Sequence, residues 1–181
     1  MKQLILILVC VLAGTLTHAQ EKKVLVAYFS CTGNTETVAK AIAQATHATL
    51  YRIQAEKAYS AADLDWQDKQ SRSSIEMGST TSRPVLADKN AQAESYDVLF
   101  LGYPIWWNQS PRIINTFIES YNLKGKTVIP FATSGSSSIQ NSTNLLKKQY
   151  SDINWQTGRL LNNGTPDAIK WAEGVVKVSH R

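Results

Sequence analysis

Six consecutive residues, most of them small and polar, could bind a phosphate group: Ser30-Cys31-Thr32-Gly33-Asn34-Thr35. They stand between an apolar stretch and a segment with helical spacing, so their backbone N–H groups would point into a turn at a helix N-terminus, where anions bind. The hydroxyls can donate further hydrogen bonds, and Gly33 allows close approach of the backbone. The run has neither the lysine of a triphosphate-binding loop nor the three glycines of a dinucleotide-binding turn, so a terminal monophosphate fits best. The alternative is an ordinary strand-to-helix turn.

Two adjacent tryptophans, Trp106 and Trp107, are the second candidate feature. Large aromatic side chains are normally buried or functional, so two of them in one loop predict a flat heteroaromatic ligand as a stacking partner. We expect one indole to be structural and the other to face the ligand. Trp106 is the favoured ring neighbour because it is closer to the end of the preceding strand. The alternative is that both indoles pack on neighbouring helices.

A third loop, residues 133–138, is small and polar and includes Ser134, Gly135 and Ser136. Its hydroxyl and N–H groups could hydrogen-bond the edge of a polar ring system. Loops of this composition are common, so the loop alone is weak evidence. A phosphorylated planar heterocycle would satisfy all three loops together.

The elements that must position these loops can be read from hydropathy. Continuous apolar stretches predict buried strands over residues 24–29, 48–53, 96–102, 126–132 and 153–161. Spacing and start signals predict helices over residues 35–45, 111–121, 138–150 and 166–177, with Pro111 in a first turn and Thr165 as an N-cap. Residues 54–95 are the least regular part, with a broken helix over 61–77 and a loop around Pro84.

Strands that alternate with helices in this way predict an α/β fold with a doubly wound, five-stranded parallel sheet. Ligands of such sheets bind beyond the carboxyl ends of the strands. The three loops follow the first, third and fourth strands, so we expect them to meet at one edge of the sheet.

The phosphate loop, Ser30-x-Thr32-Gly33-Asn34-Thr35, resembles the Ser/Thr-x-Thr-Gly-x-Thr pattern of the flavodoxin family, and the resemblance extends over residues 22–177. Residues 103–107, 111–112 and 116–119 resemble one bacterial subgroup of that family. The resemblance implies the flavodoxin-like strand order 2-1-3-4-5 and flavin mononucleotide (FMN) as cofactor. It also implies three groups of cofactor-binding residues: Ser30, Thr32, Gly33, Asn34 and Thr35 at the phosphate; Pro104, Ile105, Trp106, Trp107 and Asn108 beside the isoalloxazine ring; Ser134, Gly135 and Ser136 on its other side.

The function that this resemblance favours is electron transfer to or from a redox partner protein. Two alternatives stay open: an FMN-dependent quinone or NAD(P)H-linked reductase with a small-molecule acceptor, and a binding domain that has lost FMN. The sequence shows no nucleophile or general-base constellation and no metal-ligand spacing, so we predict no catalytic residue and no metal site. Cys31 is either a reactive thiol at a helix N-terminus or a tolerated residue at a variable position, and we favour the second interpretation.

The composition and charge of the chain limit which classes of partner are expected. Hydrophobic residues make up 43% and charged residues 18% of the chain, a balance that suits a globular core. The formal net charge is +5, whereas family electron carriers are commonly acidic, so the usual basic partner is not expected. The lysines and arginines are scattered without a long basic run, so we expect no nucleic-acid partner.

Residues 1–19 have the three parts of a secretory signal. Lys2 precedes an uncharged apolar run, Leu4 to Leu16, and Thr17-His18-Ala19 offers a cleavage site before Gln20. The run is shorter than the roughly 20 residues that span a bilayer, so no stable membrane insertion is expected after cleavage. We therefore expect export to the periplasm or exterior of a bacterium and a single flavodoxin-like FMN-binding domain over residues 20–181. Its one cysteine, Cys31, cannot form an internal disulfide.

Overall fold

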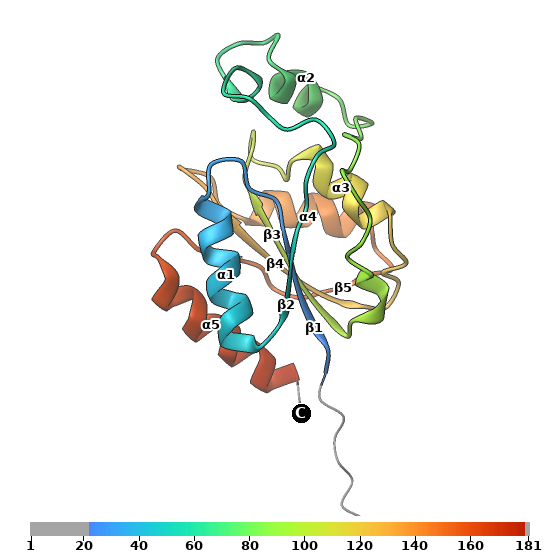
Figure 1. Ribbon diagram of the computed structural model, residues 1–181, viewed down its shortest axis with the longest axis vertical. Coiled ribbons are helices and arrows are strands. Elements are labelled where there is room, and N and C mark those ends of the chain that lie inside the picture. Colours follow the sequence, from blue (N-terminus) through green and yellow to red (C-terminus); the bar gives the residue numbers. More distant parts are fainter. Residues whose placement is uncertain (1–21, 180–181) are drawn as a thin grey trace, which may run out of the picture.

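A parallel sheet lies at the centre of the computed structural model, which describes residues 22–179 (Figure 1). Its strand order is β2-β1-β3-β4-β5, and β6 also pairs with β4, so the expected order 2-1-3-4-5 is confirmed. The strands are β1 (Val24–Tyr28), β2 (Thr49–Arg52), β3 (Val98–Pro104), β4 (Thr127–Thr133), β5 (Asn154–Trp155) and β6 (Arg159–Leu160). The expected signal, residues 1–19, lies outside the described residues.

Helices cover both faces of the sheet, which explains why the central strands β1, β3 and β4 are continuous apolar runs (Figure 1). One layer contains α1 (Asn34–Thr46) and α5 (Thr165–Ser179), and the other contains α3 (Arg112–Glu119) and α4 (Gln140–Gln149). Side chains of a strand alternate between the two layers. In β1, Val26 packs in the core beneath α1 and α5, whereas Leu25 and Ala27 pack in the core beneath α3 and α4. The doubly wound architecture is therefore confirmed.

The expected fifth strand, residues 153–161, is interrupted opposite Pro130. The carbonyls of Val128 and Ala132 accept hydrogen bonds from the N–H groups of Gln156 (2.9 Å) and Leu161 (2.8 Å), so even-numbered residues of β4 face this strand. Pro130 also faces it and has no N–H to donate. The chain consequently pairs as β5 before this point and as β6 after it, with residues 156–158 opposite only residues 129–130.

Pro111 lies just before α3 rather than in its first turn. It is the N-cap residue, with φ −56° and ψ 144°, and the helix begins at Arg112 and ends before Tyr121. The extended ψ of Pro111 keeps it outside the helix although its φ would fit one. The other predicted helices are present with ends that differ by one or two residues, the uncertainty usual for helix boundaries.

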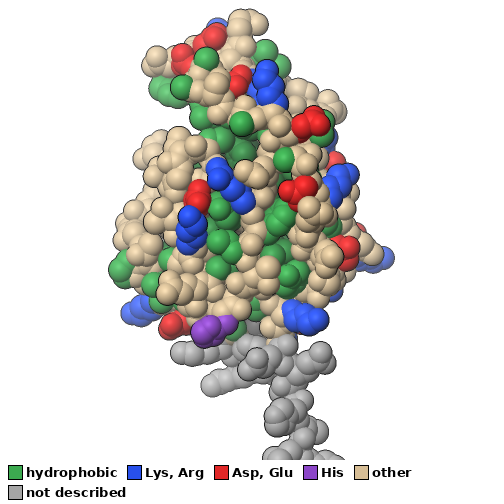
Figure 2. All heavy atoms as spheres, viewed as in Figure 1, with side chains coloured by type: hydrophobic (Ala, Val, Ile, Leu, Met, Phe, Trp, Pro, Cys, Tyr) green, Lys and Arg blue, Asp and Glu red, His purple; other side chains and the backbone are tan. Residues whose placement is uncertain are grey.

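The chain between β2 and β3 folds into a separate projection, residues 56–85, which we call the lobe. Its two ends are joined where the Glu56 N–H donates to the Val85 carbonyl (2.9 Å), beside an antiparallel bridge between Ala55 and Leu86. The expected broken helix appears here as η1 (Ala62–Leu64) and α2 (Arg72–Gly78), and a further short helix, η2 (Ala93–Ser95), precedes β3. Figures 1 and 2 show the lobe standing out from the body beyond one end of the sheet.

Arg112 ties the lobe to α3. Its side chain is buried, and its guanidinium donates to the carbonyls of Ser79 (2.8 Å) and Met77 (3.1 Å) at the end of α2. Burial lowers the pKa of this guanidinium, yet carbonyl dipoles at a helix C-terminus favour a cation there. A bidentate ion pair between Arg83 of the lobe and Glu119 of α3 adds a second connection (2.7 and 2.9 Å).

Figure 2 shows basic and acidic side chains interspersed over the face in view. Within residues 22–179, no helix combines the length and the apolar character needed to cross a bilayer.

Candidate functional site

The loop between β1 and α1 ends in a glycine that leaves the helix N-terminus uncapped. Gly33 is the N-cap residue of α1 and has φ +91°, a backbone conformation that glycine adopts without strain. Its own N–H donates to Ser30 Oγ (3.2 Å), which tightens the turn. Because glycine has no side-chain oxygen, no side chain caps the first N–H groups of α1. These donors are thus directed at the sheet edge where an anion would bind.

The hydroxyls of this loop differ in their surroundings. Thr35 is almost fully buried, and its Oγ1 hydrogen-bonds Thr133 Oγ1 at the end of β4 (2.8 Å). Since one hydroxyl of the pair donates to the other, one proton is left to point elsewhere. Thr32 is exposed, and Ser30 is buried at the strand end. The loop therefore offers both a fixed hydroxyl pair and a free hydroxyl.

The loop after β3 is a tight two-residue turn. Trp106 and Gln109 exchange backbone hydrogen bonds (2.9 and 2.8 Å), and the residues between them, Trp107 and Asn108, have φ +44° and +60°. Two positive φ values in succession define a type I′ turn, which usually holds Asn or Gly. The Asn141 side chain of α4 donates to the Asn108 carbonyl (2.8 Å) and fixes the turn from outside.

The two tryptophans of this turn have different surroundings. The Trp106 ring packs edge-on against Phe29 and Tyr59, each with a centroid distance of 5.6 Å. Trp107 is 44% exposed. The packing role therefore falls to Trp106 rather than Trp107. Since both side chains also line the cavity described below, which ring contacts a ligand stays a prediction that single substitutions test.

The loop after β4 is ordered around Ser134. Its Oγ accepts hydrogen bonds from the N–H groups of Ser136 (3.3 Å) and Ser137 (2.9 Å). The Asn162 side chain holds the same residue from the other side, accepting from the Ser134 N–H (3.0 Å) and donating to its carbonyl (2.6 Å). The serine hydroxyls of the following residues are thereby presented at the sheet edge.

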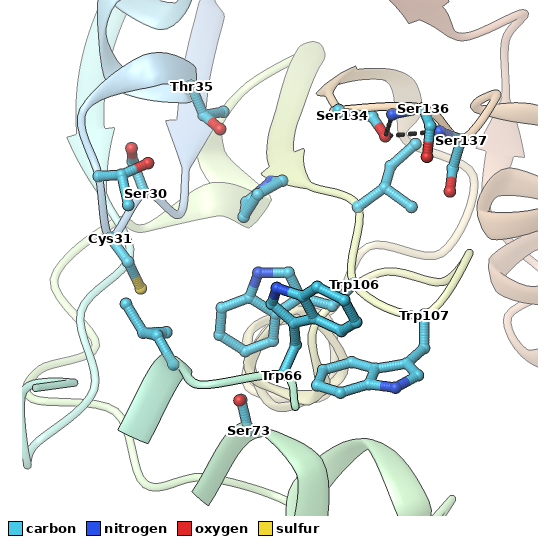
Figure 3. A pocket seen from close by; sticks show the side chains of 15 residues that line it. Ser30, Cys31, Thr35, Trp66, Ser73, Trp106, Trp107, Ser134, Ser136 and Ser137 are labelled. Atoms are coloured by element: carbon cyan, nitrogen blue, oxygen red, sulfur yellow. Dashed lines mark hydrogen bonds between the residues drawn. The ribbon is translucent and has the colours of Figure 1, made fainter. Parts of the chain in front are cut away.

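A cavity of about 500 Å³ lies between these three loops and the lobe (Figure 3). A second cavity of about 580 Å³ adjoins it on the side of α1 and α5 and shares part of its wall. The structure brings most predicted residues to the first cavity: Ser30, Thr32, Thr35, Pro104, Ile105, Trp106, Trp107, Ser134, Gly135 and Ser136. Asn34 lines the second cavity only, and Gly33 and Asn108 line neither, so these two shape the loops.

Several wall residues were not predicted from the sequence. The lobe contributes Leu64, Trp66 and Ser73 to the first cavity, which Cys31 and Ser137 also line. The segment before α5 contributes Leu161, Asn162 and Gly164 to the second, and α5 contributes its first residue, Thr165. Trp66 is 70% exposed and stands in a polar stretch, so its isolation was the one signal that could have identified it.

The lobe wall is stabilised by a half-buried ionic cluster. The Tyr59 hydroxyl donates to Glu76 (2.6 Å), Arg72 pairs with the same carboxylate (2.6 Å), and the Arg72 guanidinium lies 3.9 Å from the centre of the Tyr59 ring. Burial and the hydrogen bond to Glu76 raise the pKa of Tyr59. Because Tyr59 also contacts Trp106, this cluster connects the lobe to the loop after β3.

Neither cavity is lined by a charged side chain. Burial raises the pKa of the Cys31 thiol to about 11, against the opposing effect of Arg52 and Arg72. The hypothesis of a reactive, low-pKa thiol at the helix N-terminus is therefore wrong, because desolvation outweighs the nearby positive charge. The described part of the chain contains no cluster of His, Cys, Asp and Glu that could hold a metal ion.

Comparison with known proteins agrees with this architecture. The family model for flavodoxin matches residues 23–175. A protein from Bacteroides uniformis ATCC 8492, provisionally described as a flavoprotein, has 55% sequence identity and a TM-score of 0.81, over 84% of this chain and 98% of that one. A protein from Bacteroides eggerthii DSM 20697 with the same provisional description has 52% identity and a TM-score of 0.81, over 86% and 98% of the two chains.

A flavoprotein from Lactobacillus acidophilus NCFM, solved in complex with FMN, shares the fold with a TM-score of 0.64 at 20% identity, over 83% of this chain and 99% of that one. No curated protein sequence matches this chain. Since the family match covers nearly all of the described residues, the chain belongs to the flavodoxin family.

Proposed function

We propose that the protein binds FMN at the carboxyl edge of its sheet and acts in electron transfer. The observation that carries the proposal is the uncapped N-terminus of α1, whose N–H groups face this edge beside the hydroxyls of Ser30, Thr32 and Thr35. A terminal phosphate dianion suits such a set of neutral donors. The lining fits a phosphorylated ring compound better than a triphosphate, because no lysine is present to neutralise further charge.

The same edge has the residues needed for the rest of FMN. Ser30, Thr32, Gly33, Asn34 and Thr35 would hold the phosphate. Residues 104–107 and 134–136 would border the isoalloxazine ring, with aromatic rings on one side and hydroxyl and N–H donors on the other. Bound FMN supplies reversible one- and two-electron chemistry, and the protein tunes it through contacts and charge. The FMN complex of the relative from Lactobacillus acidophilus supports this choice of cofactor.

The uncharged lining also bears on the redox properties. Negative charge added to the flavin on reduction would meet no cationic side chain in the wall of either cavity. Unscreened repulsion by the phosphate disfavours that charge. We therefore expect a low reduction potential, as suits an electron carrier.

A second candidate function, FMN-dependent reduction of a small molecule, is favoured by one observation. The first cavity extends to the lobe, where Leu64, Trp66 and Ser73 form a wall beyond the residues implied for FMN. A carrier that reacts only with proteins needs no such enclosed space. The immediate electron partner is then a small acceptor rather than a redox protein.

We propose that this chemistry takes place outside the bacterial cytoplasm, because residues 1–19 have the composition of an export signal. FMN is then carried out with the folded protein or acquired after export. A redox partner in that compartment, rather than a nucleic acid or a membrane, is the expected contact.

Absorption spectroscopy of the protein purified from its native compartment tests the proposal. Bound oxidised FMN that is reversibly reduced, with slow steady-state turnover of NADH, NADPH and quinones, is the result expected of a carrier. Rapid turnover with one of these small molecules would favour the reductase. A colourless protein that does not take up added FMN would overturn both and favour a binding domain without flavin.

A further inference from the structure

The first cavity continues past the place proposed for FMN toward the lobe. The two cavities share the wall formed by Thr32, residues 104–106 and residues 134–135, which is where FMN is proposed to lie. At the lobe end the first cavity is lined by a different set, Leu64, Trp66, Ser73, Trp107 and Ser137. Trp107 is also one of the residues proposed to border the isoalloxazine ring, and it would face both ligands. The other four are not among the residues implied for FMN, so they enclose additional space.

Two tryptophans project into this end from different elements (Figure 3). Trp66 of the lobe is 70% exposed and Trp107 is 44% exposed, although tryptophan is among the side chains most strongly favoured for burial on average. Trp107 also has φ +44°, a left-handed conformation that is unfavourable for a bulky residue. Neither the exposure of these indoles nor the positive φ of Trp107 stabilises the folded state. Such unfavourable features are found at functional sites, where the residue serves binding.

The backbone segments that carry both indoles are hydrogen-bonded before any ligand arrives. The Trp66 segment contains two turns in which Asp65 and Asp68 accept hydrogen bonds from N–H groups two residues later (2.9 and 2.8 Å). Trp107 is fixed by the hydrogen-bonded turn described above. Because the backbone at both tryptophans is already ordered, binding of a ring costs only the entropy of fixing the two side chains.

The side chains at the lobe end of the first cavity indicate which class of ligand it could bind. No charged side chain lines this cavity, and Arg72 and Glu76 of the lobe pair with each other. The pyrophosphate of a nicotinamide dinucleotide would have no cation to meet. The hydroxyls of Ser73 and Ser137 are hydrogen-bond donors suited to carbonyl oxygens. An uncharged, planar aromatic ring with carbonyl groups fits these features.

We propose that the lobe end of the cavity is a binding site for a neutral quinone, which stacks on Trp66 and Trp107 next to the cofactor. The site rests on the proposed function, because the cofactor closes its inner side. If the site binds a quinone, the small molecule reduced in the second candidate function is a quinone. NAD(P)H is then not the ligand of this site.

Calorimetric titration of the oxidised, FMN-loaded protein with 2-methyl-1,4-naphthoquinone tests the proposal without relying on turnover. The wild type should bind it saturably, and 1,4-naphthoquinone-2-sulfonate should bind roughly tenfold more weakly because the wall cannot neutralise its charge. Trp66→Ala should weaken naphthoquinone binding roughly tenfold, the usual effect of losing one stacking partner. Trp66→Phe should restore most of the affinity. Ile75→Ala, which removes another exposed apolar side chain of the lobe outside the cavity lining, is the matched control and should change nothing.

A separate FMN titration of each variant distinguishes the two proposals. FMN affinity should stay unchanged in Trp66→Ala. If wild-type protein fails to bind FMN, the proposed function fails and the quinone site with it. If FMN binds normally, three results overturn the quinone site alone: displacement of naphthoquinone by FMN, equal affinity for the sulfonate, or full affinity in Trp66→Ala.

Discussion

The environment of Cys31 determines its chemistry more than its place at a helix N-terminus does. The residue is one position of a loop that resembles a phosphate-binding turn, and two arginines lie close enough to favour a thiolate. Burial acts in the opposite sense and has the larger effect, so the pKa is raised to about 11. Burial of this kind depends on the lobe and on neighbouring side chains, which the local sequence does not reveal.

The raised pKa predicts a slowly reacting thiol. Only the thiolate is nucleophilic, so alkylation of Cys31 by iodoacetamide should be slow at pH 7 and rise roughly tenfold per pH unit toward about 11. Free cysteine, with its pKa near 8.5, is the reference reaction, and Cys31→Ser protein that begins at Gln20, and so lacks Cys10, should show no modification. Mass spectrometry measures the rate. Rapid modification at pH 7 with a plateau below pH 8 would show that the thiol is activated after all.

Thr32 and Thr35 should both contribute to FMN affinity. Their substitution by Ala should differ in its effect on the stability of the FMN-free protein. Either Ala substitution should weaken FMN by on the order of 1–2 kcal/mol, as for a hydrogen bond to a charged group. Thr35→Ala should also destabilise the FMN-free protein by about 1 kcal/mol or more, because it leaves the buried Thr133 hydroxyl without its partner. Thr32 is exposed, so its substitution should leave unfolding unchanged.

Chemical denaturation and FMN titration of the two variants provide the measurements. Equal losses of apo stability would contradict the different surroundings of the two hydroxyls. Unchanged FMN affinity in both variants would remove the hydroxyls from the phosphate site.

At the scale of elements, hydropathy was sufficient for most of the fold. The strands and helices on both faces of the sheet follow from buried runs and helical spacing, because each element carries its own pattern. The division of the fifth strand was missed because its cause, Pro130, lies on the neighbouring strand. The N-cap position of Pro111 was missed because φ alone does not distinguish it from a first-turn proline.

The turn that holds Trp107 would be more stable with another residue type at this position, although the indole is available to a ligand. Trp107→Asn places a residue favoured in type I′ turns at φ +44°, so the FMN-free protein should become about 1 kcal/mol more stable. Trp106→Ala should instead destabilise it by about 3 kcal/mol, because that ring packs against Phe29 and Tyr59. Thermal unfolding of both apo variants is the test. A large loss of stability in Trp107→Asn would show that its indole is part of the core.

Considered as a whole molecule, the protein combines a sheet edge at which three loops meet with a lobe between β2 and β3. The three loops could be placed together from the sequence because parallel strands end at the same edge. The wall formed by Trp66 could not, since residues 54–95 carry little periodicity and their position depends on distant contacts such as Arg112 with Met77 and Ser79. The site is thus predictable where it follows strand ends and unpredictable where it depends on the lobe.

Export is a property of the whole chain and predicts where the mature protein begins. Signal peptidase should cleave after Ala19, because Thr17 and Ala19 are the small residues at the recognised positions. N-terminal sequencing of protein recovered from outside the cytoplasm should start at or near Gln20. Recovery of a chain with residues 1–19 intact would contradict export by this signal.

We propose that the edge of the sheet binds FMN through its phosphate at the N-terminus of α1. The most direct test compares FMN with riboflavin, which has the same ring and no phosphate, by fluorescence titration of the FMN-free protein. We predict saturable FMN binding and at least roughly 100-fold weaker riboflavin binding, as expected when several charge-assisted hydrogen bonds are lost. Equal affinity for the two flavins would rule out a phosphate site here, since the loop from Ser30 to Thr35 would then contribute nothing to binding.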